Sequence, residues 1–304
     1  MDKTRKSCLL ALLAAMIWGL AFVMQKQNTV GTVTFFMFRH FIAFLILIPI
    51  VLLFTKDPKH LFSAAAGEGS TKELWLGGFV CGCFMTAAGL CQQWGLDLGS
   101  TAGKGGFITA MYMVLVPVGA MVLFKTRVRA LTWVSLFLGL VGLFLLCIKP
   151  GERFETVDIF LILCAILYTG HILSVDYFSK RVNPVKLACL QMLFGTLLTV
   201  IPAFAAESFT AAQLTESLIP MLYLGIFSSG IGFSLQVLAQ SSADNAPLVT
   251  LFMSLESVFG VLFGALILKE RLSGRELAGC LVMLAAVILS QLYIGKKEEN
   301  GAEL

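Results

Sequence analysis

The chain consists of long apolar runs separated by short polar linkers, and the runs have the length of membrane-spanning helices. A helix needs roughly 17–25 mainly apolar residues to cross the hydrocarbon core of a bilayer. A backbone in lipid must satisfy its own hydrogen bonds, and the runs do not alternate as the strands of a barrel do, so we interpret them as helices. Ten are predicted, at Cys8–Met24, Thr34–Phe54, Leu74–Trp94, Gly105–Phe124, Ala130–Ile148, Val157–Val175, Val185–Phe204, Ser217–Ala239, Ala246–Leu268 and Glu276–Tyr293.

The composition agrees with a protein that crosses the membrane many times. Of the 304 residues, 58% are hydrophobic and 13% are charged, whereas a soluble domain carries roughly 25% charged residues. So few polar groups could not cover a soluble particle, and the apolar content is too high for a disordered chain. The composition therefore argues against a soluble enzyme and against a nucleic-acid binder, and we expect an all-α membrane protein of ten transmembrane helices.

Neither the cysteines nor the histidines are spaced for catalysis or metal binding. The eight cysteines lie in or beside apolar runs, and Cys81 and Cys83 would point to nearly opposite faces of a helix. The three histidines lie in different segments. Gly103–Gly106 resembles a phosphate-binding loop only superficially, because it lacks the full Walker pattern. We expect no enzyme activity, no cofactor and no metal.

The distribution of Lys and Arg predicts the orientation in the membrane. With the N-terminus in the cytoplasm, the inner segments hold about twice as many Lys and Arg as the outer ones, as the positive-inside rule requires. The basic linker Lys269–Arg275 is the exception, because it would lie outside. The first run follows Lys3, Arg5 and Lys6 as in a signal peptide, but no clean cleavage site ends it, so we interpret it as a retained span. Both termini are expected in the cytoplasm, with the protein in the cell (plasma or inner) membrane.

The two halves of the chain can be laid over each other. At a spacing of 148 residues Gln92 matches Gln240, among other positions, and at a spacing of 144 the segment Phe124–Val128 lies over Leu268–Leu272. Because five is an odd number, a second set of five spans enters the membrane from the opposite side. We expect two inverted five-helix repeats, residues 1–150 and residues 151–304. The second range includes a short cytoplasmic tail.

Motifs in both halves resemble those of a known family. They are Leu255–Gly260, Leu268–Leu272 and Glu276–Cys280 in the second half, and Ala14–Gly19, Gly106–Tyr112 and Val116–Gly119 in the first. On these motifs the chain resembles EamA-type transporters of the drug/metabolite transporter superfamily. The resemblance implies secondary transport, without ATP, of small organic solutes such as amino acids, related metabolites or amphiphilic compounds, usually for export. It also implies alternating access around a cavity at the membrane midplane.

Two residues depart from the family pattern. Thr126 stands where the motif of the first half would have an acid, which leaves a linker of uncompensated positive charge that suits the cytoplasmic side. Ser257 stands where many members have Pro after the Glu. The sequence therefore gives no reason to expect a helix break inside the run Ala246–Leu268.

Glu256 is the most informative polar residue, because it lies in the middle of a predicted span, where a charge costs a few kcal/mol. It could bind a substrate amine or a proton at a central cavity, or it could be a structural Glu that is hydrogen-bonded or protonated among the helices. Gly260 and Gly264 follow at helical spacing and predict that this face meets another helix.

Other polar and aromatic residues inside the spans each allow two interpretations. Arg39 could bind a carboxylate in the cavity or anchor the outer interface. His171, which shares a face with Tyr168, could bind substrate or relay protons, or could be a packed, satisfied side chain. Gln236 belongs to a stripe with Ser229, Phe233 and Gln240, which we expect to face the cavity together with its repeat image, formed by Cys81, Met85, Ala88 and Gln92. Trp18 and Tyr112, near the middle of their spans, could line a pocket or pack in the core.

We therefore interpret the chain as a secondary transporter that moves a small organic solute by alternating access. Its partners would be that solute and membrane lipid, with no nucleic acid, and it could be a monomer or a homodimer. The alternatives are a channel-like or non-transporting membrane protein and, more weakly, an intramembrane enzyme acting on lipid. The predicted substrate-binding residues are Trp18, Arg39, Tyr112, Tyr168, His171, Gln236 and Glu256.

Overall fold

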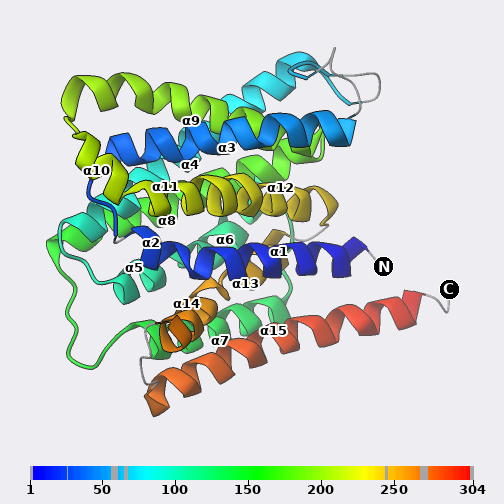
Figure 1. The fold of residues 1–304 in the computed structure, drawn as a ribbon. Coiled ribbons are helices and arrows are strands. Elements are labelled where there is room, and N and C mark those ends of the chain that lie inside the picture. Colours follow the sequence, from blue (N-terminus) through cyan, green and yellow to red (C-terminus); the bar gives the residue numbers. More distant parts are fainter. Residues whose placement is uncertain are drawn as a thin grey trace.

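The computed structural model describes residues 3–25, 27–55, 61–64, 68–243, 246–267 and 273–301, and every regular element in these ranges is helical (Figure 1). Eight helical segments of the described residues are long and apolar enough to cross a membrane, and they coincide with the first eight predicted runs. They consist of α1 (Lys3–Gly19) with α2 (Ala21–Gln25), α3 (Thr32–Thr55), α4 (Thr71–Asp97), α5 (Ala102–Thr109) with α6 (Tyr112–Phe124), α7 (Ala130–Cys147), α8 (Ile159–Ser179), α9 (Pro184–Ala206), and α11 (Leu218–Leu222) continued by a π-helical stretch (Tyr223–Gly232) and α12 (Phe233–Ser242). The short α10 (Ala211–Glu216) precedes α11.

The ninth predicted run is interrupted, so the expectation of an unbroken helix there is wrong. It forms α13 (Ala246–Met253) and α14 (Glu256–Ile267), separated by a turn at Ser254 and Leu255. The backbone bonds at this turn join residues three apart, from Leu255 N to Phe252 O and from Ser257 N to Ser254 O, and the Ser254 hydroxyl donates to the Leu251 carbonyl at 2.8 Å. Such tightened bonds and a serine that competes for backbone carbonyls end a helix without proline. The tenth run is α15 (Gly274–Gly301), and Leu268–Leu272 lie outside the described residues.

Polar side chains fix where several helices begin. The Ser70 hydroxyl accepts from the Glu73 amide ahead of α4, and Thr101 does the same for Lys104 ahead of α5. Asn183 accepts from two amides ahead of α9, whose first residue is Pro184. These residues satisfy amides that have no partner within the helix, and proline at the first helical position needs none.

Each of two helices packs against a set of three others. α8 packs against α4, α5 and α6, and α1 packs against α12, α13 and α14, while α8 and α12 also pack against each other. We call these sets the α8 group and the α1 group. Outside them, α3 lies along α9, and α7 lies along α15. A Cβ added at Gly260 would lie 3.1 Å from the Gly19 carbonyl oxygen of α1. The face of α14 that carries Gly260 therefore packs on another helix, as predicted.

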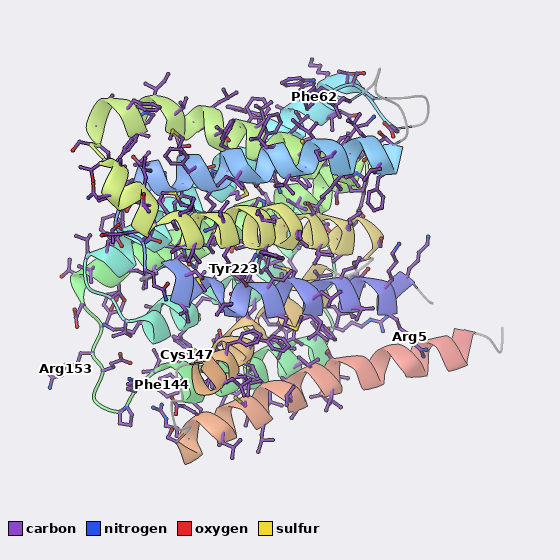
Figure 2. All side chains as sticks on the ribbon, viewed as in Figure 1. Arg5, Phe62, Phe144, Cys147, Arg153 and Tyr223 are labelled. Atoms are coloured by element: carbon purple, nitrogen blue, oxygen red, sulfur yellow. The ribbon has the colours of Figure 1, made fainter. Side chains whose placement is uncertain are left out.

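The two ends of the bundle carry segments that the sequence analysis placed on opposite sides of the membrane. Arg5 lies at the end where α1 begins and α15 finishes, and Arg153 lies at the opposite end (Figure 2). At the start of α15, the Arg275 guanidinium donates to the Ile148 carbonyl, just after α7. The first turn of α15 therefore lies at the same end as the linker that contains Arg153.

Candidate functional site

A cavity lies between the α8 group and the α1 group. Every predicted site residue except His171 lines it. The lining residues are Trp18, Ala21, Gln25, Arg39, Gln92, Thr109, Tyr112, Tyr168, Ile172, Ser228, Phe233, Gln236, Met253 and Glu256.

Arg39 contributes a positive charge to the cavity wall from α3. Its side chain is buried, with 5% exposure, so it does not extend to the surface as an interface anchor would. Its guanidinium donates to the hydroxyls of Ser229 at 2.5 Å and Ser228 at 3.1 Å, both on the π-helical stretch, and lies over the Phe36 ring. Neutral hydroxyls orient the guanidinium but leave its charge uncompensated, which suits a site for an anionic group.

Glu256 contributes a carboxyl group from the first residue of α14, directly after the helix interruption. It is 7% exposed and lines the cavity together with Tyr112, the first residue of α6. Tyr112 and Glu256 are 144 residues apart, the spacing at which the two halves of the sequence match. Each of them therefore follows a break at the same place in its half.

Neither Arg39 nor Glu256 has an ion-pair partner in the part of the chain that the structure describes. Buried charges are costly when they lack a partner, and they then favour a ligand that supplies the opposite charge. The cavity can thus present one basic and one acidic group to the same small molecule.

Aromatic side chains form much of the remaining wall. Trp18 and Phe233 pack with ring centroids 5.1 Å apart, and the Trp18 indole donates to the Ser228 carbonyl at 3.1 Å. Tyr168 adds a third ring from α8. Because the indole is held by both contacts, Trp18 offers a fixed apolar surface inside the cavity.

His171 lies behind the wall of the cavity. It is fully buried between the rings of Phe233 and Tyr168, at 5.6 and 6.3 Å, and its Nε2 is 3.1 Å from Oε1 of Gln191 on α9. On α8, Tyr168 reaches the cavity while His171 is directed towards α9. This arrangement fits the packed, hydrogen-bonded interpretation of His171.

The predicted stripes line the cavity only in part. Phe233, Gln236 and Gln92 do so, whereas the remaining members, Ser229, Gln240, Cys81, Met85 and Ala88, are buried against other helices. Such a stripe runs along about three turns of a helix, and the cavity reaches only part of that length. The sequence analysis missed several lining residues, namely Ala21, Gln25, Thr109, Ile172, Ser228 and Met253. The one available signal was the repeat match of Gln92, whose hydrogen-bond partners are Gln25 and Thr109.

Lys104, in the glycine-rich segment, has a local role. Its ammonium group is 3.1 Å from Asp158 Oδ2 and donates to the Arg153 carbonyl, while Ser100 donates to the other oxygen of Asp158. The ion pair ties the start of α5 to the segment that leads into α8. Among the described residues, no group of three or more His, Cys, Asp or Glu is placed to hold a metal ion.

The chain was compared with known protein families, curated proteins and solved structures. A family model described as "EamA-like transporter family" matches residues 5–148 and again residues 156–292. An uncharacterized transporter of Archaeoglobus fulgidus is 28% identical over 285 residues, which cover 93% of this chain and 84% of that protein. A second uncharacterized transporter of the same organism is 27% identical over 182 residues, covering 60% of this chain and 63% of its own length.

A solved crystal structure has a similar fold. Its TM-score is 0.79 at 16% sequence identity, and the match covers 96% of this chain and 98% of the other. At this identity the likeness concerns the fold alone.

Proposed function

Because the chain belongs to the EamA-like transporter family and is a multi-pass membrane transporter, we propose that it is a secondary carrier for a small organic solute with both an acidic and a basic group, such as an amino acid. The observation that carries the proposal is that Arg39 and Glu256 line one cavity together with aromatic side chains. The carboxylate of such a solute would pair with Arg39, and its ammonium group with Glu256. Its side chain would rest against the rings of Trp18 and Phe233.

The fold that we propose for this carrier has ten spans in two inverted repeats, residues 1–150 and 151–304. In its support, α5 and α13, α6 and α14, and α7 and α15 each begin 144 residues apart. The α8 group and the α1 group are images of each other under the repeat, and the family model matches the chain twice. The contact of Arg275 with Ile148 agrees with an outer position for the start of α15, and with both termini in the cytoplasm.

Alternating access would follow from movement of the α8 group against the α1 group. The cavity lies between them, and Tyr112 and Glu256 line it from the first residues of α6 and α14, the second parts of the two broken helices. A bound ammonium group or a proton at Glu256 would neutralise the carboxylate beside the broken helices, which couples occupancy of the cavity to its opening. The direction that we propose is export across the cell membrane. Family and relatives point to a role without catalysis.

The test is solute exchange in proteoliposomes loaded with amino acids, nucleobases and small amines, with and without a pH gradient. We expect saturable, selective loss of zwitterionic solutes, which Arg39→Met and Glu256→Gln abolish. The matched control is Glu216→Gln, an exposed acid at the end of α10, which should leave exchange unchanged.

Three outcomes would contradict parts of the proposal. Exchange restricted to uncharged solutes would refute the zwitterion. Flux without saturation or counterflow would indicate a channel. If Glu256→Gln kept the full dependence on the pH gradient, proton coupling through Glu256 would be wrong while the carrier remained.

A further inference from the structure

Two glutamines at equivalent positions of the two halves have corresponding contacts. Gln92 lies near the end of α4 and Gln240 near the end of α12, 148 residues further on. Both are buried, with 7% and 0% exposure. A buried primary amide has two donors and an acceptor to satisfy, so its partners report which helices it holds together.

Gln92 joins the α8 group to the α1 group. Its Oε1 accepts from Nε2 of Gln25 at 3.4 Å, and its Nε2 donates to the Thr109 hydroxyl at 3.2 Å. Gln25 ends α2, which continues α1 and packs against α14, whereas Thr109 ends α5. The bond with Gln25 is therefore a contact between the two groups.

Gln240 joins the same two groups from the other half. Its Nε2 donates to the Ile172 carbonyl of α8 at 2.9 Å, and its Oε1 accepts from Nε2 of Gln236 on its own helix at 3.1 Å. Ile172 follows Gln25 by 147 residues, so the partner also lies in nearly the equivalent turn of the other repeat. The contact across the groups is thus made twice, once by each half.

The two contacts lie at opposite ends of the cavity. Gln25 and Gln92, which form the first contact, line the cavity, and so do Ile172 and Gln236, which belong to the second. α4 belongs to the third of the eight long apolar segments and α12 to the eighth, so the two helices run in opposite directions and their last turns are at opposite ends. With the N-terminus in the cytoplasm, Gln92 is towards the outside and Gln240 towards the inside.

We propose that Gln92 and Gln240 hold the outer and the inner gate of the carrier closed. The hydrogen bond that each makes across the two groups must break before the cavity opens to that side, and we call these two contacts the latches. This inference rests on the proposed function. Both contacts are formed in this structure. Bonds between neutral amides suit such a role, because each contributes little net stability and can break without leaving a buried charge.

The test measures access to the cavity and needs no substrate. Ala21, which lines the cavity, is replaced as Ala21→Cys in a full-length chain without other cysteines, and a membrane-impermeant thiol reagent is applied from one side of oriented vesicles at a time. Gln92→Met and Gln240→Met keep the side-chain length but remove the amide. We expect each to raise the labelling rate about fivefold, from opposite sides, which is the effect of losing one neutral hydrogen bond.

The matched control is Gln93→Met. Gln93 is the neighbour of Gln92 but donates to Asp97 on its own helix, so labelling from both sides should stay as in the parent chain. If a methionine variant does not fold, Gln92→Asn and Gln240→Asn remove the same contacts by shortening the side chain.

The sides of labelling separate the possible failures. An increase from the same side for both variants, or none for either, would overturn the two latches. Opposite sides in the reverse order would keep the latches and refute the cytoplasmic N-terminus. Opposite sides combined with no solute exchange would leave the latches standing while the proposed carrier function failed.

Discussion

Replacing Gly279 by alanine should weaken the contact between α7 and α15. A Cβ added at Gly279 would lie 2.7 Å from the Leu146 amide nitrogen and 2.8 Å from the Gly142 carbonyl oxygen. Both atoms belong to the backbone of α7, so no side-chain rotation can relieve the clash and the helices must move apart. The substitution Gly274→Ala, in the first turn of the same helix, is the matched control, because an added Cβ there meets no atom within 4 Å.

The expected magnitude follows from two opposing effects. Overpacking of a tight interface costs about 1–3 kcal/mol, and alanine in place of glycine inside a helix returns about 1 kcal/mol. Since every close contact of this Cβ is with backbone, we take the upper part of the first range and expect a net loss of about 1–2 kcal/mol. At about 2–4 °C for each kcal/mol, the midpoint of thermal unfolding should fall by several degrees.

The assay can use the chain's own cysteines. Cys81, Cys164 and Cys189 are buried in the folded protein, so a thiol-reactive dye in detergent reports their exposure as the protein is heated. Gly279→Ala should shift the transition to lower temperature, whereas Gly274→Ala should not. Equal midpoints for the two variants would refute the close approach of α7 and α15.

Two further substitutions test charges. Asp158→Asn removes the closer of the two carboxylates that pair with the buried ammonium group of Lys104, and because Glu155 remains at 3.5 Å the cost should be about 2 kcal/mol, below that of a fully unpaired buried charge. Asp176→Asn, whose partner Lys180 is 37% exposed, should cost about 0–1 kcal/mol. Equal thermal midpoints for these two variants would contradict the burial of the first pair. Arg39→Lys keeps the charge but loses the two hydrogen bonds that the planar guanidinium donates. Under the proposed function, the solute concentration that gives half-maximal exchange should rise about tenfold. An unchanged value would show that Arg39 does not bind the solute.

The interruption of the ninth run shows where sequence patterns stop being informative. The residues from Ala246 to Ile267 form one mainly apolar run. A proline after Glu256 would have signalled a helix break, but Ser257 stands at that position. The break depends instead on backbone bonds at Ser254 and Leu255, which hydropathy does not encode. It falls at the same place as the break before Tyr112, and that match becomes visible only when both helices are seen.

The sequence by itself determined the membrane class, the family resemblance, the first eight spans and most of the residues that line the cavity. Polar and aromatic groups in the middle of an apolar helix are costly in lipid, so Glu256, Arg39 and Gln236 stand out without a structure.

The tertiary structure decided which of these groups meet. His171 and Tyr168 are three residues apart on α8, yet only Tyr168 reaches the cavity, while His171 bonds to Gln191 of α9. Gln25 follows the first predicted run, Cys8–Met24, and only the structure shows that it lines the cavity and donates to Gln92 of α4. Side chains on one helical face can meet different neighbours, and the distances between helices that choose among them are set by packing across the whole bundle.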